Sequence, residues 1–257
     1  MGVPPGPWES VGMAAHDEQQ PTGSGPAEGG SPSGERPGAP VPGTSAGAAY
    51  LVRPDDGPGH GVLVLHSWWG LSPGVKRVVE RLADAGYTAL APDLSGGVAT
   101  DDPEEAQRLL ADSDPNETAA LVLASVVALR AHSADPDAPI AVLGYSMGAS
   151  WGLWLATRQP DSVDAVVAYY GTQNIDFEDL RAPVLGHYAE SDPLVSEDDL
   201  TEMHARLLLS EKSVIVHRYE GTRHWFAEED RPDFHDPVAA DLAWSRTLEF
   251  LAEHTSR

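Results

Sequence analysis

The chain has 257 residues, none of them cysteine, and carries 40 acidic against 16 basic residues for a formal net charge of −24. This length allows one large domain with its own hydrophobic core. The lack of cysteine excludes disulfides, thiolate metal ligands and a cysteine nucleophile. The strongly negative field repels phosphate groups, so we expect no nucleic acid and no anionic membrane among the partners.

The N-terminal segment differs in composition from the rest of the chain. Residues 1–47 contain 11 Gly and 9 Pro among small polar residues, too little apolar surface to offset the entropy of ordering. We therefore predict a disordered tail at 1–47 and a single domain at 48–257. No signal-peptide pattern and no apolar run of the roughly 20 residues of a membrane span is present. A cytoplasmic monomer or small homo-oligomer is expected.

From residue 48 onward, short apolar runs alternate with longer amphipathic segments. In chain order the pattern predicts a strand at 60–66, a helix at 73–85, a strand at 87–91, a helix at 116–132, a strand at 140–144, a helix at 148–157, strands at 163–170 and 184–188, a helix at 197–209, a strand at 214–219 and a helix at 237–254. Such alternation is typical of the α/β class, with a mostly parallel central sheet covered by helices on both faces.

One pentapeptide between a predicted strand and a predicted helix carries a chemical signal. Gly144-Tyr145-Ser146-Met147-Gly148 matches G-x-S-x-G, the nucleophile elbow of α/β-hydrolases. The small residues permit a tight turn that exposes the serine hydroxyl, and the positive end of the following helix favours a developing oxyanion. The alternative is an ordinary turn in which Ser146 only caps a helix.

A serine nucleophile needs a base and an acid that orients it, and in α/β-hydrolases both follow later strands in the order acid, then histidine. Asp192 comes just after the predicted strand at 184–188, with Glu190 and Asp198 as competing carboxylates. As an Asp before a Pro, it also fits a simple turn. We take Asp192 as the orienting acid.

The base must lie in a loop after the last predicted strand. Among ten histidines, only His224 and His235 meet that condition, and His224 is nearer to the strand end. His187, inside a predicted strand, is interpreted as a packed core residue. His224 is therefore the predicted base, which completes a triad with Ser146 and Asp192.

Two backbone amides are expected to bind the oxyanion. One belongs to Met147, directly after the nucleophile, and the other to Trp68 in the loop after the strand at 60–66. Metal chemistry is not supported, because His60 and His66 lack the spacing of a helical zinc pair. No phosphate-binding loop is present either, so we expect neither a metal nor a cofactor.

At this point the residues resemble the dienelactone hydrolase family of α/β-hydrolases, from about Ala48 to the C-terminus. The resemblance rests on HSWWGLSPGVKRVVERLADAGYTALAPDL at 66–94, GYSMGA at 144–149, HYAESDPLV at 187–195, GTRHWFAEEDRPDFHD at 221–236 and SRTLEFL at 245–251. It implies a single domain without a large lid that hydrolyses small esters or lactones. By position, it also assigns the triad to Ser146, Asp192 and His224, and the oxyanion amides to Trp68 and Met147.

The sequence departs from the best-known members of that family around the substrate. Those members use a cysteine nucleophile and carry a glutamate where this chain has Ser67. Their two arginines, which hold the substrate carboxylate, fall on Gly97 and Glu228. We therefore expect neutral substrates to be preferred, and we expect the substrate pocket to be lined by Ser67, Trp69, Trp225 and Glu228, with an ordinary core position as the alternative for Trp69.

The predicted function is hydrolysis of a small carboxylic ester or lactone through a Ser-His-Asp triad and an acyl-enzyme. The same triad could instead pass the acyl group to an alcohol, an amine or a peroxide, as in an acyltransferase or a perhydrolase. A catalytically inactive binding module on the same fold is the remaining alternative. A peptidase is disfavoured, because no additional lid or propeller domain is apparent.

Overall fold

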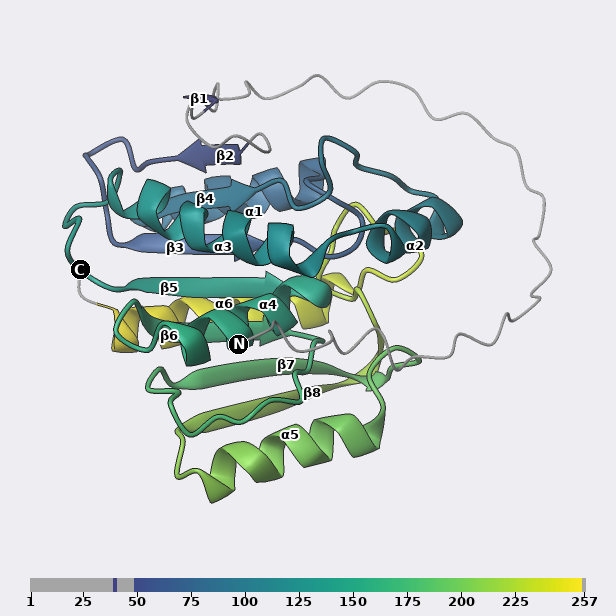
Figure 1. The fold of residues 1–257 in the computed structure, drawn as a ribbon. Helices are drawn as coiled ribbons and strands as arrows, with labels where there is room; N and C mark the ends of the chain where they lie inside the picture. Colours follow the sequence, from purple (N-terminus) through teal and green to yellow (C-terminus); the bar gives the residue numbers. More distant parts are fainter. Residues whose placement is uncertain (1–38, 41–48, 256–257) are drawn as a thin grey trace, which may run out of the picture.

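The computed structural model describes residues 39–40 and 49–255, and these residues form an eight-stranded sheet (Figure 1). In spatial order the strands are β1 (Ala39–Pro40), β2 (Ala49–Val52), β4 (Thr88–Pro92), β3 (Gly61–Leu65), β5 (Ile140–Tyr145), β6 (Val163–Tyr169), β7 (Val184–Ser191) and β8 (Val214–Arg223). β1 and β2 pair antiparallel, as do β2 and β4, and every other pair is parallel.

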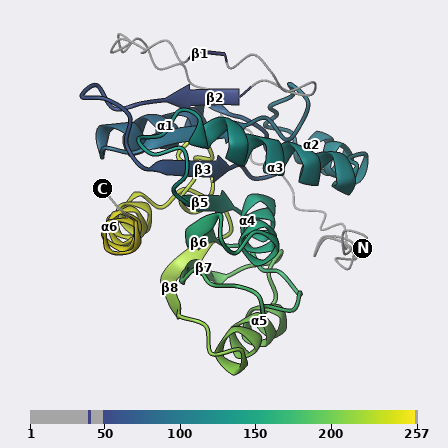
Figure 2. The same cartoon turned by 60° about the vertical axis from the view of Figure 1, so that its left-hand side comes forward.

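Helices cover both faces of this sheet. They are α1 (Pro73–Asp84), α2 (Pro103–Ala111), α3 (Pro115–Arg130), α4 (Met147–Arg158), α5 (Glu197–Leu209) and α6 (Pro237–His254). α1 and α6 contribute to the core on one face, and α3, α4 and α5 contribute to the core on the other (Figure 2). The predicted α/β fold class is confirmed.

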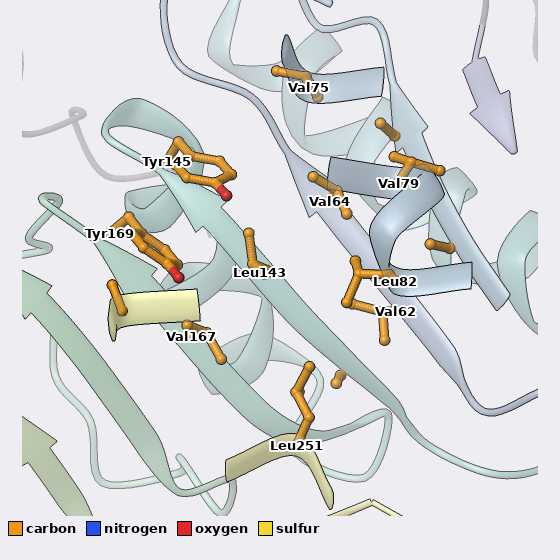
Figure 3. Close-up of a cluster of buried hydrophobic side chains, with 14 of the residues drawn as sticks. Val62, Val64, Val75, Val79, Leu82, Leu143, Tyr145, Val167, Tyr169 and Leu251 are labelled. Carbon is orange, nitrogen blue, oxygen red and sulfur yellow. The ribbon is translucent and has the colours of Figure 1, made fainter. Parts of the chain in front are cut away.

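The central strands are apolar throughout because both of their faces are covered. Every residue of β3, β4 and β5 is buried, as expected for parallel strands between two helical layers. On the face of α1 and α6, Val62 and Leu143 of the sheet pack with Leu82 and Leu251 of the two helices (Figure 3). The sheet therefore forms a rigid platform whose strand ends can hold a site.

Most helices begin at a side-chain cap followed by proline. Ser72, Asp102, Asp114 and Asp236 each accept a backbone N–H of the first turn, and a proline follows each of them. α2 was not predicted from the sequence, although Asp102 and the two glutamates after its proline are a helix-start signal. Figure 1 shows α2 beyond the carboxyl ends of the central strands.

The other main differences from the prediction are at strands: β2 was not predicted, and two strands end later than predicted. β7 and β8 continue to Ser191 and Arg223, several residues beyond the predicted ends, with a register irregularity between Ala189 and Ser191. Of the predicted tail, Ala39–Pro40 pairs with β2, and the rest lies outside the described residues. Across the part of the chain that the structure describes, no helix is long and apolar enough to cross a membrane.

Candidate active site

The strand register brings the predicted site residues to one edge of the sheet. Leu65 pairs with Gly144, Tyr145 pairs with Tyr169, and Ser191 pairs with Arg223. The residues that follow these paired positions are His66, Ser146, Tyr170, Asp192 and His224. Because neighbouring parallel strands end together, segments far apart in sequence meet at this edge.

Ser146 occupies a strained turn between β5 and α4. Its φ is 52°, a left-handed value that costs a residue with a side chain about 1–2 kcal/mol. A Cβ on Gly144 would lie 2.4 Å from the Gly148 oxygen, and a Cβ on Gly148 would lie 2.1 Å from the Leu65 oxygen. Both glycines of the G-x-S-x-G motif are therefore required by close backbone approach.

His224 bridges the serine and the carboxylate. Its Nε2 lies 2.8 Å from the Ser146 Oγ, and its Nδ1 lies 2.7 Å from the Asp192 Oδ2. Because an ionised carboxylate only accepts hydrogen bonds, the protonated Nδ1 donates a hydrogen bond to Asp192, and the unprotonated Nε2 accepts one from the Ser146 hydroxyl. The imidazole is 1% exposed and is held between these two partners.

Asp192 is held in place by its own turn. Its Oδ1 accepts the backbone N–H groups of Leu194 and Val195 at 2.9 and 3.0 Å, which leaves Oδ2 directed at His224. The competing carboxylate Glu190 instead accepts the Gly221 N–H at 2.8 Å. The turn that made Asp192 ambiguous in the sequence is thus what orients it.

The alternatives to His224 lie elsewhere. His235 borders a separate cavity between α1 and α6. His187 is fully buried, with Nδ1 2.7 Å from the Tyr219 hydroxyl and Nε2 3.1 Å from the Thr247 hydroxyl. Burial lowers the pKa of His187 to about 3, so this histidine is neutral and has a packing role, as predicted.

The loop after β3 lies directly against the start of α4. The close approach of Gly148 to the oxygens of Leu65 and His66 puts the next residues, Ser67 and Trp68, beside the elbow. His66 holds this loop, because its Nε2 accepts the Leu94 N–H at 2.9 Å while its Nδ1 donates to the Ser67 oxygen at 2.7 Å. Burial lowers the pKa of His66, which keeps this neutral arrangement.

This loop-holding role of His66 was not predicted from the sequence, which suggested only a metal ligand to be rejected. Its position directly before the predicted oxyanion loop was the available signal. Within the described residues, no group of three or more His, Asp or Glu side chains could hold a metal ion.

A cavity of about 200 Å³ opens beside the serine. Its lining is largely apolar and includes no lysine, arginine, aspartate or glutamate. The lining residues are Trp68, Gln107, Leu110, Ala111, Ser146, Met147, Ser150, Tyr170, Gly171, Thr172, Leu194, Val195 and His224. Both predicted oxyanion residues thus border the same space as the serine and the histidine, and α2 supplies one wall.

The four residues predicted to line the pocket do not line this cavity. Trp69 and Trp225 are 3% and 8% exposed and pack on each other and on Trp68, with ring centroids 5.2 to 5.5 Å apart. Ser67 and Glu228 are also buried and bond to each other. These side chains form a layer behind the cavity wall, where Ser67 bonds to Glu228 and the indole rings pack on one another.

Nearby positive charges are also directed away from the cavity. The Arg231 guanidinium lies over the Trp69 ring, 4.4 Å from its centroid, and pairs with Asp101. The Arg223 guanidinium lies over the Phe234 ring, 5.3 Å from its centroid. Gly97 is exposed and is not part of the lining either. Neither arginine therefore replaces the carboxylate-holding charges that the sequence lacks.

Comparison with known proteins identifies the family of the chain. The family model described as the dienelactone hydrolase family matches residues 48–255. The chain is 33% identical over 214 residues to Protein usf of Aquifex pyrophilus, covering 80% of this chain and 92% of that protein. It is 30% identical over 223 residues to a Bradyrhizobium protein named as a 2-oxo-3-(5-oxofuran-2-ylidene)propanoate lactonase, covering 80% and 89%.

A solved structure shares the fold. The dienelactone hydrolase structure from Klebsiella pneumoniae superimposes with a TM-score of 0.75 at 24% identity, covering 85% of this chain and 98% of that one. The fold and the strand-edge site define an α/β-hydrolase. Within that class, the chain belongs to the dienelactone hydrolase family, and it is a hydrolytic enzyme of the type that acts on esters or lactones.

Proposed function

We propose that Ser146 is the nucleophile of a two-step ester or lactone hydrolysis. His224 Nε2 accepts the hydroxyl proton as the Ser146 Oγ forms a bond to the substrate carbonyl carbon. Asp192 stabilises the imidazolium that results. The observation that carries this proposal is the continuous pair of hydrogen bonds from Asp192 through His224 to Ser146, at 2.7 and 2.8 Å, beside an apolar cavity.

The negative oxygen of the tetrahedral intermediate needs donors that are already in place. We assign this role to the backbone N–H groups of Trp68 and Met147, aided by the positive end of α4. Collapse of the intermediate breaks the bond to the leaving oxygen, which takes the proton from His224. Water then gives a proton to His224 and attacks the acyl-enzyme, and the acid is released with the Ser146 hydroxyl restored.

The cavity favours a small, neutral substrate. A carboxylate transferred into an apolar space without a cationic partner costs several kcal/mol, and the cavity lining contains no lysine or arginine. We therefore assign neutral short-chain esters or lactones as the substrate class.

A fluorophosphonate probe tests the nucleophile directly, because it forms a covalent bond with an activated serine. We expect labelling of wild type at Ser146 and none of Ser146→Ala. The same variant should lower kcat on short p-nitrophenyl esters by roughly 10³-fold or more without changing the circular dichroism spectrum. Normal turnover by Ser146→Ala would assign the chemistry to another residue, and an unlabelled, inactive wild type would indicate a binding module.

Water is the acyl acceptor in this proposal. Product analysis in mixtures of water with an alcohol, an amine or peroxide checks this choice. The free acid should be the main product at low acceptor concentration. A dominant transfer product under those conditions would change the assignment to an acyltransferase or a perhydrolase.

A further inference from the structure

A buried carboxylate lies behind the active-site wall and has no part in the proposed mechanism. Glu228 is 6% exposed and sits in the turn after His224, where its backbone N–H donates to the Trp225 oxygen at 2.9 Å. Its Oε2 accepts the Ser67 hydroxyl at 2.8 Å, and its Oε1 accepts the Tyr170 hydroxyl at 3.0 Å. One side chain thus links the segments that follow β3, β6 and β8.

Each of the two hydroxyl residues, Ser67 and Tyr170, lies next to a part of the proposed catalytic site. Ser67 directly precedes Trp68, whose amide we assign to the oxyanion hole. Tyr170 has a strained φ of 38° and packs its ring on His224 with centroids 4.8 Å apart. The next residue, Gly171, lies so close to the nucleophile turn that a Cβ there would be 2.3 Å from the backbone carbonyl oxygen of Ser146.

We propose that Glu228 is a positioning residue for hydrolysis, whose ionised carboxylate holds Ser67 and Tyr170 together and thereby fixes the oxyanion loop against the catalytic histidine. This inference rests on the proposed roles of Ser146 and His224. Both partners donate to Glu228, an arrangement that only the ionised form satisfies fully. When Glu228 is protonated, one of its oxygens becomes a donor, and one hydroxyl must turn around to accept.

The surroundings of Glu228 bring this change of protonation state close to neutral pH. Burial raises the pKa of Glu228 to about 7, against the lowering effect of the Ser67 hydrogen bond. Asp230 raises it further, whereas the Tyr170 hydrogen bond and Arg231 lower it. Other titratable or charged side chains from the elements packed around it are Tyr145 at the end of β5, Arg81 of α1, Glu229 and His235 of the same loop region, and Asp241 of α6.

Because the ionised form of Glu228 is the active one, activity should fall when the pH is lowered. As the pH falls through about 7, Glu228 gains a proton and one of its two accepted bonds is lost. The acid limb of kcat/KM should therefore include an ionisation of Glu228. A residue with only a packing role would not contribute an ionisation to this limb.

Four proteins test the proposal with p-nitrophenyl acetate over a pH range of about 5 to 9. They are wild type, Glu228→Gln, Ser67→Ala and the matched control Glu229→Gln, whose exposed carboxylate pairs with Arg77. Glu228→Gln should lower kcat by about tenfold through looser positioning, with little change in KM, and should make the acid limb shallower. Ser67→Ala removes a bond that lowers the Glu228 pKa, so its limb should move to higher pH. Glu229→Gln should match wild type.

Each outcome decides the question. If Glu228→Gln keeps the kcat and the acid limb of Glu229→Gln, the positioning role is wrong. If Glu228→Gln does not fold, an unshifted limb in Ser67→Ala overturns the role in the same way. If wild type neither hydrolyses the ester nor is labelled at Ser146, the proposed function fails and this inference fails with it.

Discussion

At the scale of single residues, the tautomer of His224 determines whether Ser146 can be activated. Asp192 accepts a hydrogen bond from the Nδ1–H group at 2.7 Å, and this leaves Nε2 as the acceptor for the serine hydroxyl. An amide at position 192 would keep its oxygen on the N–H groups of Leu194 and Val195 and would turn its NH₂ group toward Nδ1. The imidazole would then carry its proton on Nε2, the wrong nitrogen for a base.

We therefore expect Asp192→Asn to keep the fold and to lower kcat by roughly 10²- to 10⁴-fold. Glu190→Gln is the matched control and should retain nearly full activity, because Glu190 bonds the Gly221 amide and not His224. Steady-state kinetics together with circular dichroism measure both effects. If Asp192→Asn behaved like wild type and Glu190→Gln were inactive, Glu190 would be the orienting acid.

At the scale of elements, the alternation of strands and helices could be predicted because burial of parallel strands leaves continuous apolar runs. The ends of β5, β7 and β8 could also be located well enough to select Ser146, Asp192 and His224. α2 was not predicted, since its nine residues expose most of their surface and bury only Ala106. Its capping sequence was the better signal.

Contacts between side chains of distant segments could not be predicted from the sequence. The bonds from Glu228 to Ser67 and Tyr170 span 161 and 58 residues, and they depend on strand order and register, which local patterns do not carry. For the same reason the residues predicted to line the pocket were placed on the wrong side of its wall. That a residue is close to the triad in sequence does not show whether its side chain faces the cavity or the core.

α2 offers a test of which element sets the size of the substrate. Leu110 lines the cavity, whereas its neighbour Leu109 does not. Leu110→Ala should widen the cavity and raise kcat/KM for longer acyl chains relative to acetate, by about fourfold for each methylene group newly buried. A series of p-nitrophenyl esters measures this ratio. Leu109→Ala should leave this ratio unchanged. If both variants gave the same ratio, α2 would not set the size of the substrate.

At the scale of the whole molecule, charge acts on the substrate before it binds. The net charge of −24 repels anions, and the cavity lining contains no lysine or arginine to offset that repulsion inside. The structure also indicates where an added positive charge could offset this repulsion. An arginine at position 228 would remove the acceptor for Ser67 and Tyr170, whereas Gln107 is exposed on α2 and borders the cavity.

We accordingly expect a neutral ester to be hydrolysed with higher kcat/KM than a matched ester that carries a carboxylate. Gln107→Arg should narrow the gap by up to about fivefold, the effect of one exposed charge pair, and Gln107→Glu should widen it. Both changes should shrink at high ionic strength, because salt screens exposed charges over about 10 Å at 0.1 M. The assay compares the two esters at low and high salt. A wild-type preference for the carboxylated ester would show that a cation reaches the substrate after all, and Arg223 or Arg231 would be the first residue to replace.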